Sequence, residues 1–451
     1  MTSRFVPPVS GASVPVRFPE MARATLDNGL ALRVIPVDAV PAITASLIIL
    51  RGTGEDPPDR HGLASLTGDL IDEGAGSRDA IELAEAFAHA GAQFDVDVGP
   101  DTTWLSVSAL SSSLDAVLEL LADIVMRPRL EEADFARVRE LRLNRLRQLS
   151  QSPGAMADRA YVSALFGAHS YGHGGTGTTA SLSAIAVDDA RAFWARHFGP
   201  VASTLIVGGD VTVHAVQRSA SRIFGHWNSP HWQTSALDRP TTVPDARILL
   251  VNRTDAPQSE LRIGHVGPSR RTEGYHALVT VNALLGGQFT SRINRKLREE
   301  KGVTYGARTS FDFRRLAGTF SCETSVQGDA TAVAVADVLA ELADVRRAGA
   351  VDADELFRAK ASLTRGYVRN FETAGQLVRA AGQLVTYGLD DNTFDRFVSS
   401  VDGVSPADIH HTASRFIRPD EATVVVVGDA SKTQESLEAL GRPLAIVAPE
   451  F

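Results

Sequence analysis

Apolar residues recur along the chain in two kinds of run, which predict two kinds of element. Short continuous runs such as Leu47–Leu50 and Val424–Val427 are typical of strands buried on both faces. Longer segments with apolar residues at every third or fourth position predict helices. In the first half we expect two strands within residues 31–50, further strands at about 92–98 and 103–110, and helices at about 62–73, at about 79–91 and from near Ser113 and Glu131 onward.

The second half shows the same succession of patterns. It predicts strands at about 246–252, 259–266, 303–313 and 317–326, and helices at 273–285, 290–299 and 329–348. Between the halves, residues 228–245 hold three prolines and little periodicity, which predicts a linker. We therefore expect two α+β domains, residues 1–227 and 246–451, each with an antiparallel sheet covered by helices.

An internal repeat supports this division. Residues 182–211 align without a gap with residues 401–430, and each copy predicts a helix, a proline-containing turn and a buried strand closed by Gly-Asp. The identical pairs are Asp189/Asp408, Arg196/Arg415, Pro200/Pro419, Thr204/Thr423, Val207/Val426, Gly209/Gly428 and Asp210/Asp429. Because the proline turn and the closing Gly-Asp recur at the same spacing in both copies, the repeat indicates a duplication.

Composition and charge narrow the function classes. The 451 residues are 44% hydrophobic and 22% charged, which is ordinary for a globular protein and excludes collagen, coiled coil or disorder as a description of the whole chain. The formal charge of −9 argues against a nucleic-acid partner. No apolar run approaches a membrane span, residues 1–20 hold no apolar signal core, and we expect a cytoplasmic protein without a membrane partner.

Few residues suggest chemistry by themselves. Cys322 is the one cysteine, which excludes disulfides and a cysteine-rich zinc site, and its predicted strand gives it the role of a small hydrophobe. Residues 172–177 match GxGxxG, but the segment before them predicts a helix end rather than the strand that a dinucleotide site requires. His169 and His173 have the spacing of a zinc pair, yet Ser170, Gly172 and Gly174 favour a loop.

Two stretches resemble the M16 (pitrilysin-like, insulinase-like) metallopeptidase family. Residues 26–78 are similar to its N-terminal domain and residues 257–311 to its C-terminal domain, and the resemblance extends from about residue 20 to 435. It implies a pair of related α/β-roll domains that form half of a clam-shaped peptide chamber.

Active family members carry HxxEH on the helix after Gly-Leu-Ala, with a distal Glu about 76 residues further on. In this chain Gly-Leu-Ala at 62–64 sets the register, so the motif positions are Ser65, Gly68 and Asp69. The distal position falls near residues 144–146, which are Asn144, Arg145 and Leu146. Two histidines and a general base are what bind zinc and activate its water, so this chain is expected to hold no zinc.

A second family motif is retained. The C-terminal domain of the family presents an Arg and a Tyr seven residues apart, which here are Arg298 and Tyr305. Gly302 is expected to end the helix and reverse the chain, so that Tyr305 begins a strand. The resemblance implies that this pair reaches the partner's zinc site and that the short turn Gly286-Gly287 lies near substrate. The alternatives are a surface Arg, a strand Tyr and a helix C-cap.

The resemblance therefore implies the non-catalytic subunit of a two-chain M16 peptidase, similar to the subunit type of mitochondrial processing peptidase that lacks HxxEH. Such a chain would be inactive alone, and an HxxEH-bearing partner of similar size would bring the zinc. It would close the chamber on short or unfolded peptides and supply Arg298 and Tyr305 in trans. A purely structural subunit, like a respiratory-complex core protein, and a peptide-binding homodimer remain open alternatives.

Overall fold

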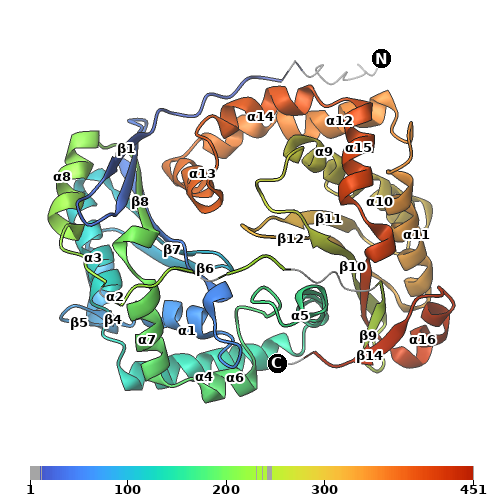
Figure 1. Cartoon of the computed structure of the whole chain (residues 1–451), viewed down its shortest axis with the longest axis horizontal. Helices are drawn as coiled ribbons and strands as arrows, with labels where there is room; N and C mark the ends of the chain where they lie inside the picture. Colours follow the sequence, from blue (N-terminus) through green and yellow to red (C-terminus); the bar gives the residue numbers. More distant parts are fainter. Residues whose placement is uncertain (1–10, 12, 230, 236, 241–245, 450) are drawn as a thin grey trace, which may run out of the picture.

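A computed structural model describes residues 11, 13–229, 231–235, 237–240, 246–449 and 451. Two six-stranded sheets stand apart in two halves of the molecule, each with helices packed against it (Figure 1). Within the described residues, no helix combines the length and the apolarity needed to cross a membrane.

The N-terminal half is built on one mixed sheet with the strand order β1-β2-β8-β3-β7-β6. Its strands are β1 (Ala22–Thr25), β2 (Ala31–Pro36), β3 (Ala42–Ile49), β6 (Gln93–Val98), β7 (Thr103–Leu110) and β8 (Ser203–Gly209). The helices of this half are α1 (Leu63–Leu70), α2 (Ala80–His89), α3 (Leu114–Met126), α4 (Glu132–Leu149), α6 (Thr179–Ala184), α7 (Val187–His197) and α8 (Val213–Phe224). A two-stranded ribbon, β4 (Gly74–Ala75) with β5 (Arg78–Asp79), precedes α2.

The C-terminal half repeats this plan with the order β11-β12-β10-β13-β9-β14. Its strands are β9 (Ile248–Asn252), β10 (Gln258–Gly267), β11 (Ala307–Asp312), β12 (Gly318–Gln327), β13 (Thr423–Gly428) and β14 (Leu444–Val447). Its helices are α9 (Tyr275–Leu285), α10 (Arg292–Asn294) continued by a π-helical turn (Arg295–Glu300), α11 (Thr331–Asp344), α12 (Ala353–Thr364), α14 (Thr393–Asp402), α15 (Pro406–Phe416) and α16 (Ala430–Glu438).

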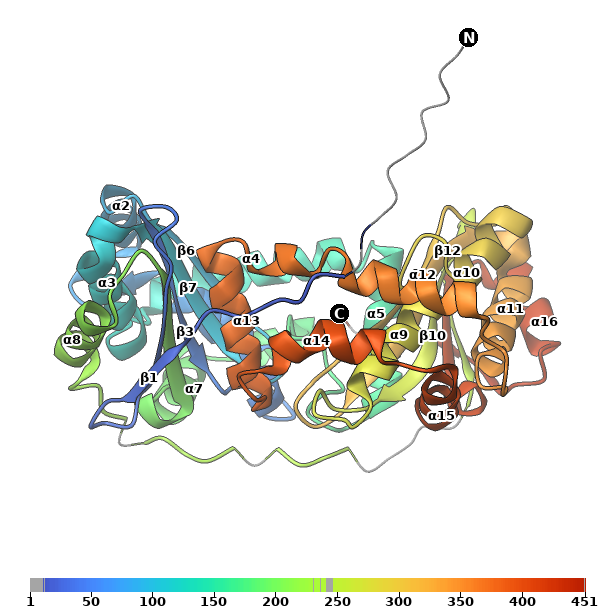
Figure 2. The ribbon, with the colours of Figure 1, turned by 90° about the horizontal axis from the view of Figure 1, so that it is seen from above.

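One helix from each half packs on the sheet of the other half. Helix α5 (Pro153–Phe166) lies against β10 and β13, where Tyr161 donates a hydrogen bond to the carbonyl of Phe320 at 2.5 Å. Helix α13 (Ala374–Tyr387) lies against β3 and β8 (Figure 2), and Gly382 admits the ring of Trp104 so closely that a Cβ there would lie 2.0 Å from it. The exchange ties the halves together through buried cores rather than through the linker alone.

The expected mixture of helices and sheets in two repeated halves is confirmed, with two differences. Each sheet includes parallel pairs (β2 with β8; β13 with β9; β9 with β14), whereas we expected antiparallel sheets. The strand expected from residue 303 begins only at Ala307. Of the predicted linker, residues 230, 236 and 241–245 lie outside the described residues, and the others carry no helix or strand. The domain boundaries stay a prediction.

Candidate functional site

Helix α1 carries the three positions at which the family motif would place its zinc site. Gly62 precedes the helix in the left-handed region (φ +95°), which a residue with a side chain rarely adopts. The buried carboxylate of Asp56 accepts hydrogen bonds from the backbone N–H groups of Gly62 and Ala64, each at 2.7 Å, and so holds the start of the helix. Burial raises the pKa of Asp56 to about 7 despite these two donors.

The three motif positions are engaged in packing and in an ion pair. Ser65 is 7% exposed and is covered by Gly175. A Cβ added at Gly175 would lie 3.3 Å from the hydroxyl oxygen of Ser65. A Cβ at Gly68 would lie 2.6 Å from Cγ2 of Val98 on β6, so there is no room for a glutamate. Asp69 accepts a hydrogen bond from Nε of Arg142 at 2.7 Å.

Arg142, on α4, is the residue that sequence reasoning missed. The register pointed to residues 144–146, but Leu146 is buried, and Asn144 and Arg145 contact neighbours on their own helix. The buried positions Phe135, Val138 and Leu146 already mark the face of α4 to which residue 142 also belongs, so the helical period could have found it. The positive charge of Arg142 beside Asp69 would repel a metal cation at this position.

The donor set does not fit a zinc ion. Zinc in proteins takes nitrogen, sulfur or carboxylate donors in a tetrahedral array, and the motif positions offer one hydroxyl, no side chain and one carboxylate already paired with arginine. Among the residues that the structure describes, no group of three or more His, Cys, Asp or Glu side chains could hold a metal ion.

The glycine-rich segment, residues 172–177, is a loop between α5 and α6 that packs on the start of α1. A Cβ at Gly177 would lie 2.2 Å from the carbonyl oxygen of His61, so this close approach requires glycine. The ring of His173 stacks on that of His61 with 4.0 Å between centroids. Burial, and then the neighbouring His61, lower the pKa of His173 to about 4, so it is neutral at pH 7.

The two histidines considered as a zinc pair have separate partners. Nε2 of His169 lies 2.8 Å from the carbonyl oxygen of Asp238, and its Nδ1 accepts a hydrogen bond from the backbone of Tyr171 at 2.9 Å. His173 instead faces His61 and, at 3.9 Å, the Asp56 carboxylate. The two histidines lie apart because they are on a loop, as the glycines predicted, and not on a helix.

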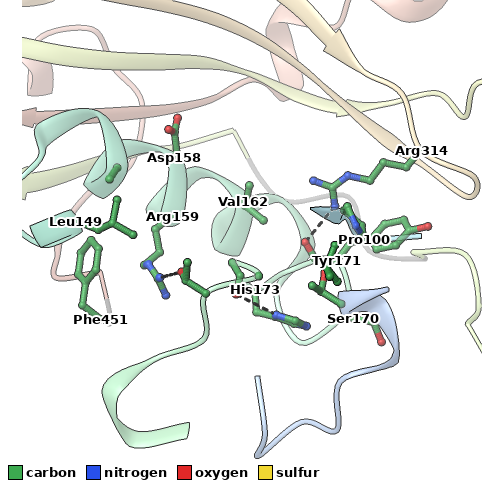
Figure 3. Close-up of a pocket in the computed structure, with 16 residues that line it drawn as sticks. Pro100, Leu149, Asp158, Arg159, Val162, Ser170, Tyr171, His173, Arg314 and Phe451 are labelled. Carbon is green, nitrogen blue, oxygen red and sulfur yellow. Dashed lines mark hydrogen bonds between the residues drawn. The ribbon is translucent and has the colours of Figure 1, made fainter. Parts of the chain in front are cut away.

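A cavity of about 290 Å³ lies beside this segment (Figure 3). The two halves meet at its lining residue Tyr171, which donates to Asp101, while the backbone N–H of Arg315, from the β11–β12 hairpin, donates to the same carboxylate at 2.8 Å. Arg159 and Phe451 line its other side. No pattern in the sequence predicts this meeting of distant segments.

Arg298 and Tyr305 lie on the C-terminal half. Arg298 is in the π-helical turn, with its guanidinium 3.4 Å from the ring centroid of Phe289 and one nitrogen donating to Glu299 at 2.9 Å. Gly302 adopts φ +67° and reverses the chain as expected. Tyr305 is 96% exposed. Phe289, itself 71% exposed, is a contact that sequence reasoning did not assign.

The expectation that Tyr305 begins a strand is wrong. The side chain of Asn294 accepts from the backbone N–H of Ala307 at 2.8 Å and donates to its carbonyl at 2.7 Å, and β11 starts at that residue. Thr304 donates to the carbonyl of Ser325 at 2.7 Å. These side-chain bonds hold the Tyr305 backbone outside the ladder.

Close packing explains Gly286 and Gly287. Gly286 caps the C-terminus of α9, where a Cβ would lie 2.6 Å from the backbone nitrogen of Thr309. Gly287 donates its N–H to the carbonyl of Asn282 at 2.8 Å, and a Cβ there would meet the same residue at 2.9 Å. The C-cap alternative is therefore observed, and contact with substrate stays a prediction.

Comparison with known proteins places both halves in one family. Residues 35–178 match the family model described as Insulinase (Peptidase family M16), and residues 184–363 match the one described as Peptidase M16 inactive domain.

Similar proteins match over almost the whole chain. A zinc protease of Streptomyces coelicolor is 23% identical over 92% of this chain and 91% of its own length, and one of Mycobacterium tuberculosis is 24% identical over 91% and 94%. A crystal structure described as a peptidase M16 inactive domain from Pseudomonas fluorescens superimposes with a TM-score of 0.85 at 21% identity, covering 91% of this chain and 98% of that one. A protease from Helicobacter pylori gives 0.84 at 18%, covering 91% and 100%.

Proposed function

Because the chain belongs to the M16 peptidase family, we propose that it is the non-catalytic subunit of a two-chain zinc metallopeptidase. Its partner is an M16 chain of similar size that carries HxxEH and binds the zinc. This chain closes the peptide chamber and presents Arg298 and Tyr305 to the partner's site. The substrates are short or unfolded peptides.

The observation that carries the proposal is the contrast between the two motifs. At the zinc-site positions, Gly68 has no room for a base and Asp69 is paired with Arg142. At the second motif, Tyr305 projects into solvent with 96% of its surface exposed. An exposed tyrosine is enriched at interfaces, where its ring packs and its hydroxyl bonds a partner group.

Arg298 and Tyr305 suit a role in stabilising charge on a bound peptide. A guanidinium keeps its charge and presents five donors in a fixed fork, and a phenol adds a directional donor. Donors held in place at a carbonyl that becomes an oxyanion lower the barrier to peptide hydrolysis. Neither side chain needs a metal in its own subunit.

Reconstitution tests the proposal. The chain is purified alone and mixed with an M16 chain that carries HxxEH, and zinc content and hydrolysis of unfolded peptides are measured for each protein and for the mixture. We expect no zinc and no turnover from this chain, and turnover of the mixture well above that of the partner alone. A partner variant with Gln in place of the motif Glu serves as the control. Stoichiometric zinc with turnover by this chain alone, or a partner whose activity is unchanged on mixing, would refute the proposal.

A further inference from the structure

Asn294 is the last residue of α10, a helix that lies against strand β11 (Figure 1). It is 5% exposed, and its amide makes two opposite hydrogen bonds with the backbone of Ala307, the first residue of β11. Residues that face each other in an antiparallel sheet exchange the same two bonds. Since β11 is an edge strand, the Asn294 side chain takes the place of a neighbouring strand on its outer edge.

The orientation of this amide is set by its other neighbours. Its nitrogen lies 3.1 Å from the hydroxyl oxygen of Ser291 and 3.2 Å from the carbonyl oxygen of Gln288, in addition to the carbonyl of Ala307. Its oxygen faces the N–H of Ala307, which is a donor. Each end of the amide thus meets groups of the opposite kind, so a flipped side chain would place donor against donor. The amide holds Ala307 in one arrangement.

Tyr305 lies between two anchored points of the backbone. On one side, the hydroxyl of Thr304 donates to the carbonyl of Ser325, and on the other, Asn294 holds Ala307. The Tyr305 side chain itself is almost wholly exposed, so packing of its ring contributes little to its position. The place of the phenol therefore follows from the two anchors of its backbone.

Helix α10 has a rigid support on its other side. Arg292 is 6% exposed and forms a bidentate pair with Glu355, at 2.5 Å from Nε and 2.7 Å from one terminal nitrogen. Bidentate charge-assisted bonds fix direction as well as distance. The π-helical turn Arg295–Glu300, a form frequent at functional sites, continues from α10 and carries Arg298. Asn294 and Arg298 therefore share one fixed support.

We propose that Asn294 is a positioning residue for the peptidase reaction: it fixes the Tyr305 phenol relative to Arg298, so that both donors reach the partner's site together. This inference rests on the function proposed above. Because the Asn294 side chain is buried, it acts through Tyr305 and has no contact with substrate of its own. A displacement of about 1 Å in a positioned group can lower a rate by roughly a hundredfold, so this anchor has a measurable effect.

Hydrogen exchange of the full chain alone tests the anchoring. Asn294→Leu keeps nearly the same size and removes every bond of the amide, and we expect the backbone amide of Ala307 to exchange at least about tenfold faster. The matched control is Asn28→Leu, because the Asn28 amide donates to the backbone carbonyls of Phe224 and Trp227 in the N-terminal half. It should leave Ala307 unchanged. Thermal melting shows whether each variant folds, and Asn294→Ala replaces Asn294→Leu if that variant does not.

Kinetics of the reconstituted complex test the role in the reaction. Asn294→Leu should lower kcat about tenfold and change KM less than about twofold, whereas Asn28→Leu should match the native chain. In a Tyr305→Phe background, Asn294→Leu should have little further effect, because the hydroxyl that it positions is already gone. A general loss of folded protein would instead lower kcat equally in both backgrounds.

The outcomes separate this inference from the proposed function. A native complex without turnover would refute the proposed function. If the native complex is active, native exchange of Ala307 in Asn294→Leu would overturn the inference alone. So would a kcat equal to that of Asn28→Leu, or an undiminished effect in the Tyr305→Phe background.

Discussion

Val98 fills the space beside Gly68: a Cβ at Gly68 would lie 2.6 Å from Cγ2 of Val98. We therefore expect Gly68→Ala to lower the free energy of unfolding by about 1–3 kcal/mol, the usual cost of overpacking a core. Val98→Ala should recover part of that loss, so the double variant should be more stable than the sum of the single effects predicts. Urea denaturation of the native chain, the two single variants and the double variant measures this double-mutant cycle.

The matched control is Gly366→Ala, because that glycine has φ −104° and open space around its Cβ position. We expect it to change stability little. If Gly68→Ala behaves like this control, Val98 does not close the motif position, and the steric argument against a glutamate there fails.

Arg298→Ala and Tyr305→Phe should each lower kcat of the reconstituted peptidase by roughly 10–10³, since each removes a donor that acts on developing charge. Zinc content of the complex and its assembly should not change. Steady-state kinetics measure kcat, and size-exclusion chromatography measures the assembly of the complex. Full turnover in both variants would mean that Arg298 and Tyr305 are surface residues without a role in catalysis, and would favour a purely structural subunit.

Phe289 should position Arg298, because the guanidinium lies 3.4 Å from its ring centroid. Phe289→Ala frees the arginine to sample other rotamers, and we expect kcat of the complex to fall about threefold to tenfold with little change in KM. Phe289→Tyr keeps the π face and should retain activity. If Phe289→Ala and Phe289→Tyr are equally active, the stacking has no part in catalysis.

His265 on β10 gives stability a defined pH dependence. Its Nε2 accepts from the backbone N–H of Arg418 at 3.0 Å, and burial lowers its pKa to about 4. In the unfolded chain its pKa is about 6.5, so protons bind the unfolded state first as the pH falls. The contribution of neutral His265 to the free energy of unfolding is therefore complete above pH 6.5 and is lost as the pH falls from 6.5 to 4.

We therefore expect the stability advantage of the native chain over His265→Gln to shrink by roughly 3 kcal/mol between pH 7 and pH 4. Urea denaturation across this range measures it. His411→Gln, at an exposed histidine, is the control and should follow the native profile. A His265→Gln profile parallel to that of the native chain would contradict the assignment.

The internal repeat shows how far local pattern reaches. Asp189 and Asp408 both accept at the N-terminus of their helices, α7 and α15, and Pro200 and Pro419 both open a 3₁₀ turn before β8 and β13. Helical period, capping residues and proline stops act over a few neighbours, so the sequence alone determines them. Residue identity likewise determined that Ser65 and Gly68 cannot bind zinc.

Contacts between distant segments were decided by the tertiary structure. Asp69 meets Arg142 across 73 positions, Gly175 covers Ser65, and Phe451 reaches Arg159 from the last strand of the other half. The packing of α5 on the sheet of the C-terminal half, and the parallel pairing of β14 with β9, bring Arg159 and Phe451 together. The periodicity of a segment says which face is buried but not which distant segment covers it, because that depends on the order in which strands join the sheets.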